Sequence, residues 1–189
     1  MKSNLEIEYK TLIDEEHFTR INNHFSTILA IQQKNTYYDR VTIPLKQDKM
    51  GMRIREIDGK NQFTLKVKQQ EGHDEYEVFT EQNTLSALEK EPIYSILKEL
   101  NIQGPFQEIG HLTTYRKEIA FQHGVLCIDK NEYYGIIDYE LEFELYPHAL
   151  STEGLKEFEG FLKTFQLNFN PKKRSNIQRC IEAKEEKKD

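Results

Sequence analysis

Apolar and charged residues alternate along several short segments of the chain, beginning near its start. In residues 5–10, Leu-Glu-Ile-Glu-Tyr-Lys, every second residue is charged. Successive side chains of a β-strand point to opposite faces, so this segment predicts a strand with one apolar and one charged face. The charged face carries Glu6, Glu8 and Lys10, and such a face suits a divalent cation with an anionic ligand beside it.

The same pattern divides the rest of the chain into strands and a few short helices. The expected strands cover 3–12, 34–40, 50–57, 62–69, 74–80, one or two within 106–122, 124–130 and 136–146. Helices are expected from Asp14 as N-cap to about Phe25, over 84–100 with a second helix opening at Pro92, and over 151–166. The segment from Ser175 is a further candidate helix, and its last residues are expected to be frayed.

Strands outnumber helices in this reading, which favours an α+β, mostly antiparallel β architecture. The 189 residues contain no internal repeat and no low-complexity linker. We therefore expect a single domain over residues 1–189, with a short charged C-terminal tail from about residue 180.

The composition of the chain argues against several classes of function. The net charge of −6 argues against a general nucleic-acid-coating surface. No stretch has the apolar length of a membrane span or of a leader peptide, so no membrane partner is expected. Cys127 and Cys180 have neither metal-ligand spacing nor a disulfide framework, and a cytoplasmic location is the expectation. The sequence leaves open whether the protein is a monomer or a homodimer.

The sign of the charge differs from strand to strand. The first strand and the strand at 136–146 supply carboxylates, whereas the middle strands supply cations. The two sets are Glu6, Glu8, Glu140, Glu142 and Glu144, and Arg53, Arg55, Lys66, Lys68 and, with less regular phasing, Arg116. If the sheet closes into a barrel, its first and last strands become neighbours, and an anionic wall faces a cationic one.

A closed eight-stranded barrel has room for side chains or one small ligand. Many charges lining it are costly without compensation, and a chain of phosphates with a hard cation provides that compensation. The alternative is an open antiparallel sheet whose charged faces are exposed to solvent. Segregation of charge by strand favours the closed barrel, because a solvated face gains nothing from that order.

The run Glu6-Ile7-Glu8-Tyr9-Lys10 resembles the Glu-x-Glu-x-Lys motif of the CYTH family, the triphosphate tunnel metalloenzymes. Further segments fit in the family's order, and the whole is most similar to the small bacillar members described as triphosphatases. These segments are Tyr38-Asp39, Arg53-Ile54-Arg55, Thr64-Leu65-Lys66, Arg116, Asp129, Gly135 and Glu140-Leu141-Glu142.

The resemblance implies an eight-stranded tunnel that binds a triphosphate and one or two divalent cations, Mg²⁺ or Mn²⁺. The metal ligands it implies are Glu6, Glu8, Glu140, Glu142 and Asp129. Glu144 is added because it lies on the same alternate positions of its strand, which face inward. The phosphate-binding residues, with Lys68 added on the same ground, are Lys10, Arg53, Arg55, Lys66, Lys68 and Arg116. Glu77 also occupies an inward-facing alternate position of its strand. Glu8, Glu142 and Lys10 are the catalytic candidates, with Glu8 or Glu142 orienting water. Lys173 or Arg174, in the run that begins at Lys172, is a candidate for the tunnel mouth.

The expected activity is metal-dependent hydrolysis of a triphosphate, with inorganic triphosphate as the first choice of substrate. Two alternatives stay open: an adenylate cyclase that makes cyclic AMP from ATP, and a non-catalytic sensor of polyphosphate or a nucleotide. The six histidines have no ligand spacing and are expected to be ordinary surface or partly buried imidazoles. They are His17, His24, His73, His111, His123 and His148.

Overall fold

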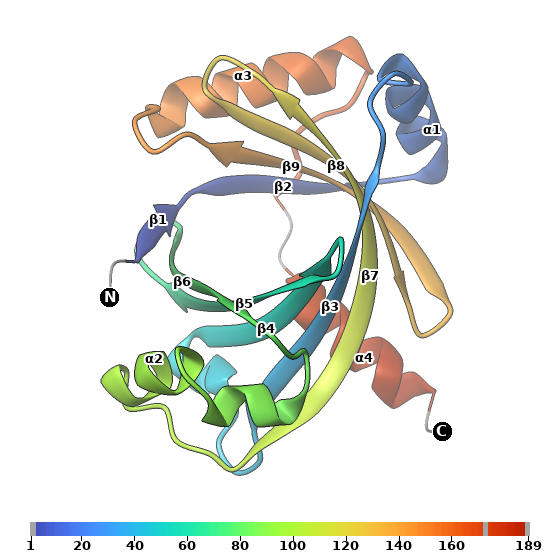
Figure 1. The fold of residues 1–189 in the computed structure, drawn as a ribbon. Helices are drawn as coiled ribbons and strands as arrows, with labels where there is room; N and C mark the ends of the chain where they lie inside the picture. The colour runs from blue at the N-terminus through green and yellow to red at the C-terminus, as the bar shows by residue number, and fades with distance from the viewer. Residues whose placement is uncertain (1–2, 172–173, 188–189) are drawn as a thin grey trace.

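One antiparallel sheet closes on itself to form a barrel (Figure 1). The computed structural model describes residues 3–171 and 174–187. Within them the strand order is β1-β6-β5-β4-β3-β7-β8-β9-β2. The two edge strands, β1 (Asn4–Glu6) and β2 (Glu8–Ile13), follow each other in the chain and are separated only at Ile7. β1 pairs with β6 and β2 with β9, so this interrupted first strand closes the barrel.

The predicted mostly antiparallel barrel is confirmed, with one difference in strand count. The structure has nine strands over the described residues rather than eight, because the expected first strand is split in two. The segment at 106–122, expected to hold one or two strands, forms a single strand of 15 residues. The remaining strands are β3 (Ile31–Arg40), β4 (Met50–Ile57), β5 (Lys60–Lys68), β6 (His73–Thr80), β7 (Phe106–Ala120), β8 (Gly124–Tyr133) and β9 (Ile136–Leu145).

The described residues contain four α-helices; the first three lie against the outside of the barrel, whereas the fourth contributes Asn176 and Ile177 to the lining of its interior. They are α1 (Glu15–His24), α2 (Ile93–Glu99), α3 (Ser151–Thr164) and α4 (Asn176–Glu186). Asp14 caps α1 by accepting a hydrogen bond from the backbone N–H of His17, and Ser175 caps α4 in the same way through Gln178. The helix expected over 84–100 is instead a 3-10 helix at Leu85–Glu89 followed by the short α2. None of the helices described has the length and apolar character that a membrane crossing requires.

Most of the apolar core lies outside the barrel wall, between the strands and the first three helices. β4 shows how alternation divides the side chains: Met52 and Ile54 are buried in an apolar cluster beneath α2, whereas Arg53 and Arg55 line a cavity inside the barrel. Figure 1 shows α1 and α3 over β8 and β9, with α2 at the opposite side of the barrel. Because the helices cover the apolar faces, the charged faces of the strands are left to point inward.

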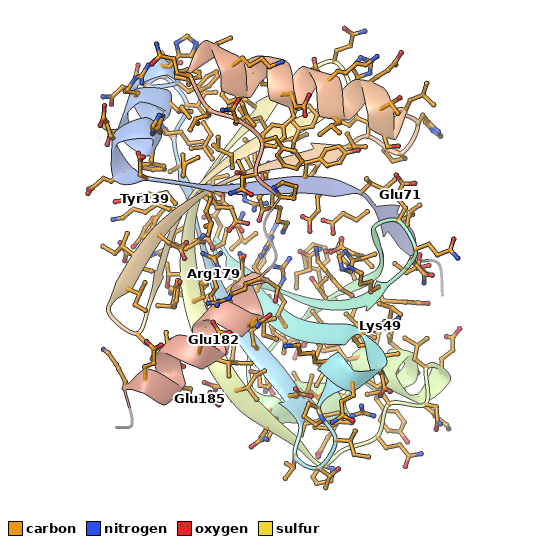
Figure 2. The ribbon with its side chains drawn as sticks, turned by 180° about the vertical axis from the view of Figure 1, so that it is seen from behind. Lys49, Glu71, Tyr139, Arg179, Glu182 and Glu185 are labelled. Carbon is orange, nitrogen blue, oxygen red and sulfur yellow. The ribbon has the colours of Figure 1, made fainter. Side chains whose placement is uncertain are left out.

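A second apolar cluster joins β8 and β9 to α1 and α3. Phe143 of β9 stacks on Phe158 of α3 with ring centroids 5.6 Å apart, and both side chains are fully buried. α4 packs separately on β7, where Cys180 donates a hydrogen bond to the carbonyl of His111. Figure 2 shows α4 from behind, with Arg179, Glu182 and Glu185 along it.

Closure of the barrel depends on a close backbone approach at Gly72. This glycine has φ +74°, and a Cβ atom there would lie 2.1 Å from the carbonyl oxygen of Glu6. Gly59 also has φ +74° but has nothing within 4 Å of the same position. The two glycines therefore share the conformational requirement and differ in the space around them.

We expect Gly59→Ala to lower the free energy of unfolding by about 1–2 kcal/mol, the cost of an alanine in the left-handed region. Gly72→Ala should cost at least about 3 kcal/mol, because the added methyl group also forces β1 and β6 apart. Urea unfolding of both variants measures the difference. Equal losses would contradict closure of the barrel through the contact between β1 and β6.

Candidate active site in the tunnel

A cavity of about 520 Å³ inside the barrel is lined by charged side chains from seven of the strands. They occupy alternate positions along each strand, such as 53 and 55 on β4, which is why they share the inner face. Its carboxylates are Glu6, Glu8, Glu75, Glu77, Glu118, Glu142 and Glu144. Its basic side chains are Lys10, Lys46, Lys49, Arg53, Arg55, Lys66, Lys68, His73 and Arg116.

The cavity brings together most of the residues singled out in the sequence. Glu6, Glu8, Lys10, Arg53, Arg55, Lys66, Lys68, Arg116, Glu142, Glu144 and Glu77 all line it. Asp129 and Glu140 do not. Asp129 is fully buried behind Arg116, whose Nε and Nη2 donate to its carboxylate oxygens at 2.8 and 2.6 Å. Glu140 is fully buried and accepts a hydrogen bond from Nη2 of Arg179 on α4 at 2.6 Å.

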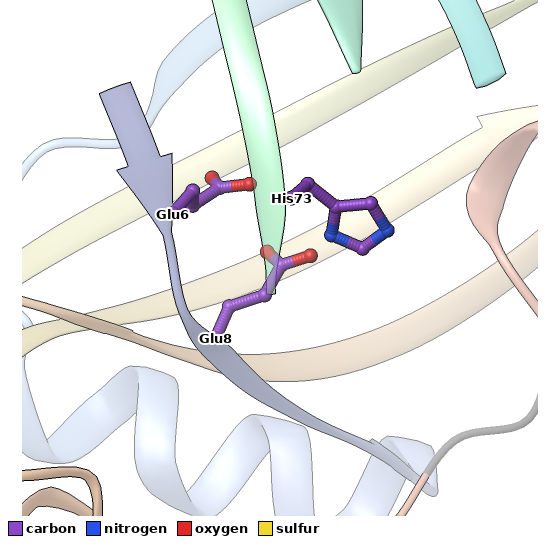
Figure 3. Close-up of side chains that lie close together, drawn as sticks. All are labelled: Glu6, Glu8 and His73. Carbon is purple, nitrogen blue, oxygen red and sulfur yellow. The ribbon is translucent and has the colours of Figure 1, made fainter. Parts of the chain in front are cut away.

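Two groups of side chains place potential metal-ligating atoms close together. One carboxylate oxygen each from Glu8, Glu142 and Glu144 lie within 4.8 Å of one another. The same limit holds for Glu6, Glu8 and His73, shown in Figure 3. Glu8 belongs to both groups. Carboxylate oxygens are the ligands that Mg²⁺, Mn²⁺ and Ca²⁺ favour, so the first donor set fits a hard divalent cation.

Burial and neighbouring charges shift the pKa values of Glu6 and Glu8 in opposite directions. Burial raises the pKa of Glu6 to about 7, with further upward contributions from Glu8 and Glu75 and an opposing one from Lys66. At Glu8 burial also favours the neutral form, but the ammonium groups of Lys10 and Lys66 outweigh it and the pKa is lowered. The tunnel therefore holds carboxylates of similar position but different proton affinity.

Three cations lie among the carboxylates as internal counterions. Lys10 Nζ lies 2.8 Å from a carboxylate oxygen of Glu8 and 2.9 Å from one of Glu142. Lys66 pairs with Glu6 and with Glu75, the latter at 2.8 Å.

Arg116 is the third internal counterion. Beyond its contacts with Asp129, it pairs with Glu142 at 2.5 Å and with Glu144 at 2.9 Å. Lys10, Lys66 and Arg116 thus sit on the anionic side of the tunnel. The expectation that an anionic wall faces a cationic one is therefore wrong in detail, because these cations lie among the carboxylates.

Arg53 and Arg55 are different, because neither has an ion pair with a carboxylate in the part of the chain that the structure describes. Nε of Arg55 donates to the side-chain oxygen of Asn35 at 2.9 Å, and Nε of Arg53 is buried with no hydrogen-bond partner among the described residues. Burial and the nearby charges of Arg53 and Arg116 lower the pKa of Arg55 to about 9. Two neighbouring guanidinium groups without a carboxylate partner in the described part of the chain have the charge and the donors that suit an anionic ligand.

The structure adds residues that the sequence analysis did not select. Glu75 and His73 share the inward face of β6 with Glu77, and the alternation of that strand is a signal that points to Glu75. Arg179 carries no such signal, because its place depends on how α4 docks on the barrel. Arg174 pairs with Glu182 on the surface at 3.1 Å and does not line the cavity. Lys172 and Lys173 lie outside the described residues.

Comparison with known proteins gives consistent matches over nearly the whole chain. The CYTH domain family matches residues 4–177. A Bacillus subtilis protein, "Putative triphosphatase YjbK", is 31% identical over 173 residues, which cover 88% of this chain and 90% of that protein. A Bacillus halodurans crystal structure, described as a "putative adenylate cyclase", is 31% identical with a TM-score of 0.81, covering 95% of this chain and 98% of that one. The Hippeastrum protein HpAC1, described as having a dominant triphosphatase activity, shares the fold with a TM-score of 0.72 at 23% identity, covering 95% and 96% of the two chains.

The raised pKa of Glu6 predicts how the metal-free protein responds to pH. Its carboxyl group binds a proton more tightly in the folded than in the unfolded state, so folding stability falls as pH rises from its ordinary pKa of 4.5 to about 7. Glu6→Gln removes this dependence, and relative to the natural protein the variant should gain about 1–3 kcal/mol between pH 5 and pH 8.

Thermal unfolding in EDTA across that range measures the effect, with Glu16→Gln on the exposed side of α1 as the matched control. A difference between the natural protein and Glu6→Gln that does not change with pH would contradict the prediction.

Proposed function

This chain belongs to the CYTH domain family, and from that premise and the charges in its tunnel we propose that it is a metal-dependent triphosphatase. The proposed reaction is attack of water on a terminal phosphoryl group, which for inorganic triphosphate yields diphosphate and orthophosphate. The substrate is a small triphosphate-containing molecule, and inorganic triphosphate is the first choice. We place the protein in the cytoplasm as a monomer or homodimer, without nucleic-acid or membrane partners.

One observation supports this proposal most strongly: Arg53 and Arg55 face a cavity whose other side presents grouped carboxylates. Two guanidinium groups with no carboxylate partner among the described residues suit phosphate oxygens, which they bind in a bidentate manner. The carboxylates of Glu8, Glu142 and Glu144 suit a divalent cation. A polyphosphate with its cation is a ligand that satisfies both sides at once, and the 520 Å³ cavity lies within the usual size range of small-molecule sites.

The roles of the residues follow from their contacts. Arg53 and Arg55 hold the phosphate chain, and Lys66 at the adjacent strand contributes a further cation. Glu8, Glu142 and Glu144 would hold Mg²⁺ or Mn²⁺, together with Glu6. Bound there, the cation supplies Lewis acidity toward the phosphate oxygens.

Lys10 and Arg116 keep the carboxylates in place through the ion pairs described above. Glu8 or Glu142 accepts a hydrogen bond from the attacking water and orients it. No covalent intermediate is needed, because positioning and charge stabilisation supply most of the catalysis of phosphoryl transfer.

Asp129 and Glu140 take supporting roles in this proposal, although the resemblance places both among the metal ligands. Each is fully buried against an arginine and away from the cavity lining. Asp129 accepts two hydrogen bonds from one edge of the Arg116 guanidinium, through Nε and Nη2, and Glu140 accepts one from Arg179 of α4. Both carboxylates therefore act through the arginines they hold.

We expect Glu8→Ala and Arg55→Ala each to lower kcat/KM for triphosphate by at least about 100-fold, because each removes charge that stabilises the transition state. EDTA should abolish phosphate release, and added Mg²⁺ or Mn²⁺ should restore it. Glu16→Ala and Arg20→Ala on the exposed surface of α1 are the charge-matched controls and should keep natural activity. Near-natural turnover in both tunnel variants would contradict the proposed site.

The products separate this function from its alternatives. The Bacillus halodurans relative is described as an adenylate cyclase, so ATP is tested beside triphosphate and thiamine triphosphate. Phosphate release from one of them is the expected result. Formation of cyclic AMP from ATP would instead identify a cyclase, and tight metal-assisted binding without turnover would identify a sensor.

A further inference from the structure

His73 lies at one end of the tunnel because of the strand pairing that closes the barrel. It is the first residue of β6 and is the direct cross-strand partner of Glu6 on β1. Directly opposed residues in an antiparallel pair place their side chains on the same face, with Cβ atoms about 4.5–5.5 Å apart. Gly72, immediately before His73, allows the two backbones to come this close.

The imidazole of His73 shares its position with two carboxylates. A ring nitrogen of His73 and one oxygen each from Glu6 and Glu8 lie within 4.8 Å of one another. Figure 3 shows both carboxylates turned toward the ring. Ligand atoms about 2.1 Å from one metal ion lie at most about 4.2 Å apart. Small side-chain rotations therefore bring all three atoms onto one cation.

Nδ1 of His73 adds an independent observation. This nitrogen is buried and has no hydrogen-bond partner among the described residues. A buried polar atom without a partner is costly, and native structures rarely leave one unexplained. A cation between the imidazole and the two carboxylates would give Nδ1 the partner that it lacks.

Lys66 forms an ion pair with Glu6, and this pair would have to break for Glu6 to bind a metal ion. Its ammonium group also pairs with Glu75 at 2.8 Å. Lys66 therefore keeps a carboxylate partner when Glu6 turns toward another cation, so the protein can exchange one counterion for another without leaving Lys66 buried and unpaired.

We propose that His73, Glu6 and Glu8 form a mixed nitrogen–oxygen site that binds a divalent transition-metal ion such as Mn²⁺ in preference to Mg²⁺. Imidazole is a ligand for transition metals, whereas Mg²⁺ favours oxygen donors and retains its waters. The all-carboxylate set of Glu8, Glu142 and Glu144 has no such bias. The proposal rests on the proposed function only in placing a cation in the same tunnel.

Pulsed electron paramagnetic resonance of the full chain with substoichiometric Mn²⁺ tests the site directly. The natural protein should show coupling of Mn²⁺ to an imidazole ¹⁴N, and His73→Ala and His73→Gln should both lose it. Calorimetric titration should show Mn²⁺ affinity reduced by about tenfold or more in these variants. Mg²⁺ affinity should change less than about threefold, because oxygen ligands dominate its binding. His111→Gln, at an exposed histidine of β7 outside the cavity, is the matched control and should match the natural protein.

Absence of nitrogen coupling in the natural protein would overturn the proposal, without reference to any variant. So would coupling that persists in both His73 variants, because another nitrogen would then be the ligand. Phosphate release from triphosphate is measured separately with Mg²⁺. Nitrogen coupling without hydrolysis would reject the proposed function alone, and hydrolysis without nitrogen coupling would reject only the role of His73.

Discussion

The constraint that the rest of the structure depends on is the inverted distribution of polarity across the barrel wall. Apolar side chains of the strands pack outward against helices, so the interior is left to charged side chains. Buried charges are costly unless they are paired or coordinate a ligand. Inside this barrel the pairing is incomplete: Lys10, Lys66 and Arg116 balance carboxylates, while Arg53 and Arg55 have no carboxylate partner among the described residues. The positive charge of these two arginines is what suits the tunnel to an anionic ligand in the proposed function.

The closing contact of the barrel and its candidate chemistry involve the same few residues. The first strand is interrupted at Ile7, so its two halves pair with β6 on one side and β9 on the other. Glu6 precedes the break and Glu8 follows it, which places carboxylates of one short segment beside two distant strands. Glu8 consequently reaches Glu142 and Glu144 as well as the group around Glu6. Barrel closure therefore creates the carboxylate groups, and local unfolding of β1 would dismantle one of them.

Much of the fold and of the tunnel lining could be predicted from the sequence, because both follow from the way successive side chains of a strand point to opposite faces. Alternation in segments such as Arg53-Ile54-Arg55 fixes which side chains share a face, and the need to cover apolar faces assigns the charged ones to the interior. The alternation of side chains does not give the depth of a residue along the tunnel. It could not separate Glu142, which lines the cavity, from Glu140, which is buried away from the cavity lining. Arg179 could not be predicted either, because it reaches Glu140 only through the docking of a helix about forty residues later in the chain. His73 lacked a sequence motif because its neighbours Glu6 and Glu8 come from the first strand segments, far earlier in the chain.

A crystal structure of the protein with a non-hydrolysable triphosphate analogue and a divalent cation tests the inverted barrel most directly. The predicted result is an analogue inside the tunnel, with phosphate oxygens in hydrogen-bonding distance of the Arg53 and Arg55 guanidinium groups and the cation among the carboxylates that include Glu8. An analogue bound on the outer surface, or arginines turned away from a tunnel filled by apolar side chains, would contradict it.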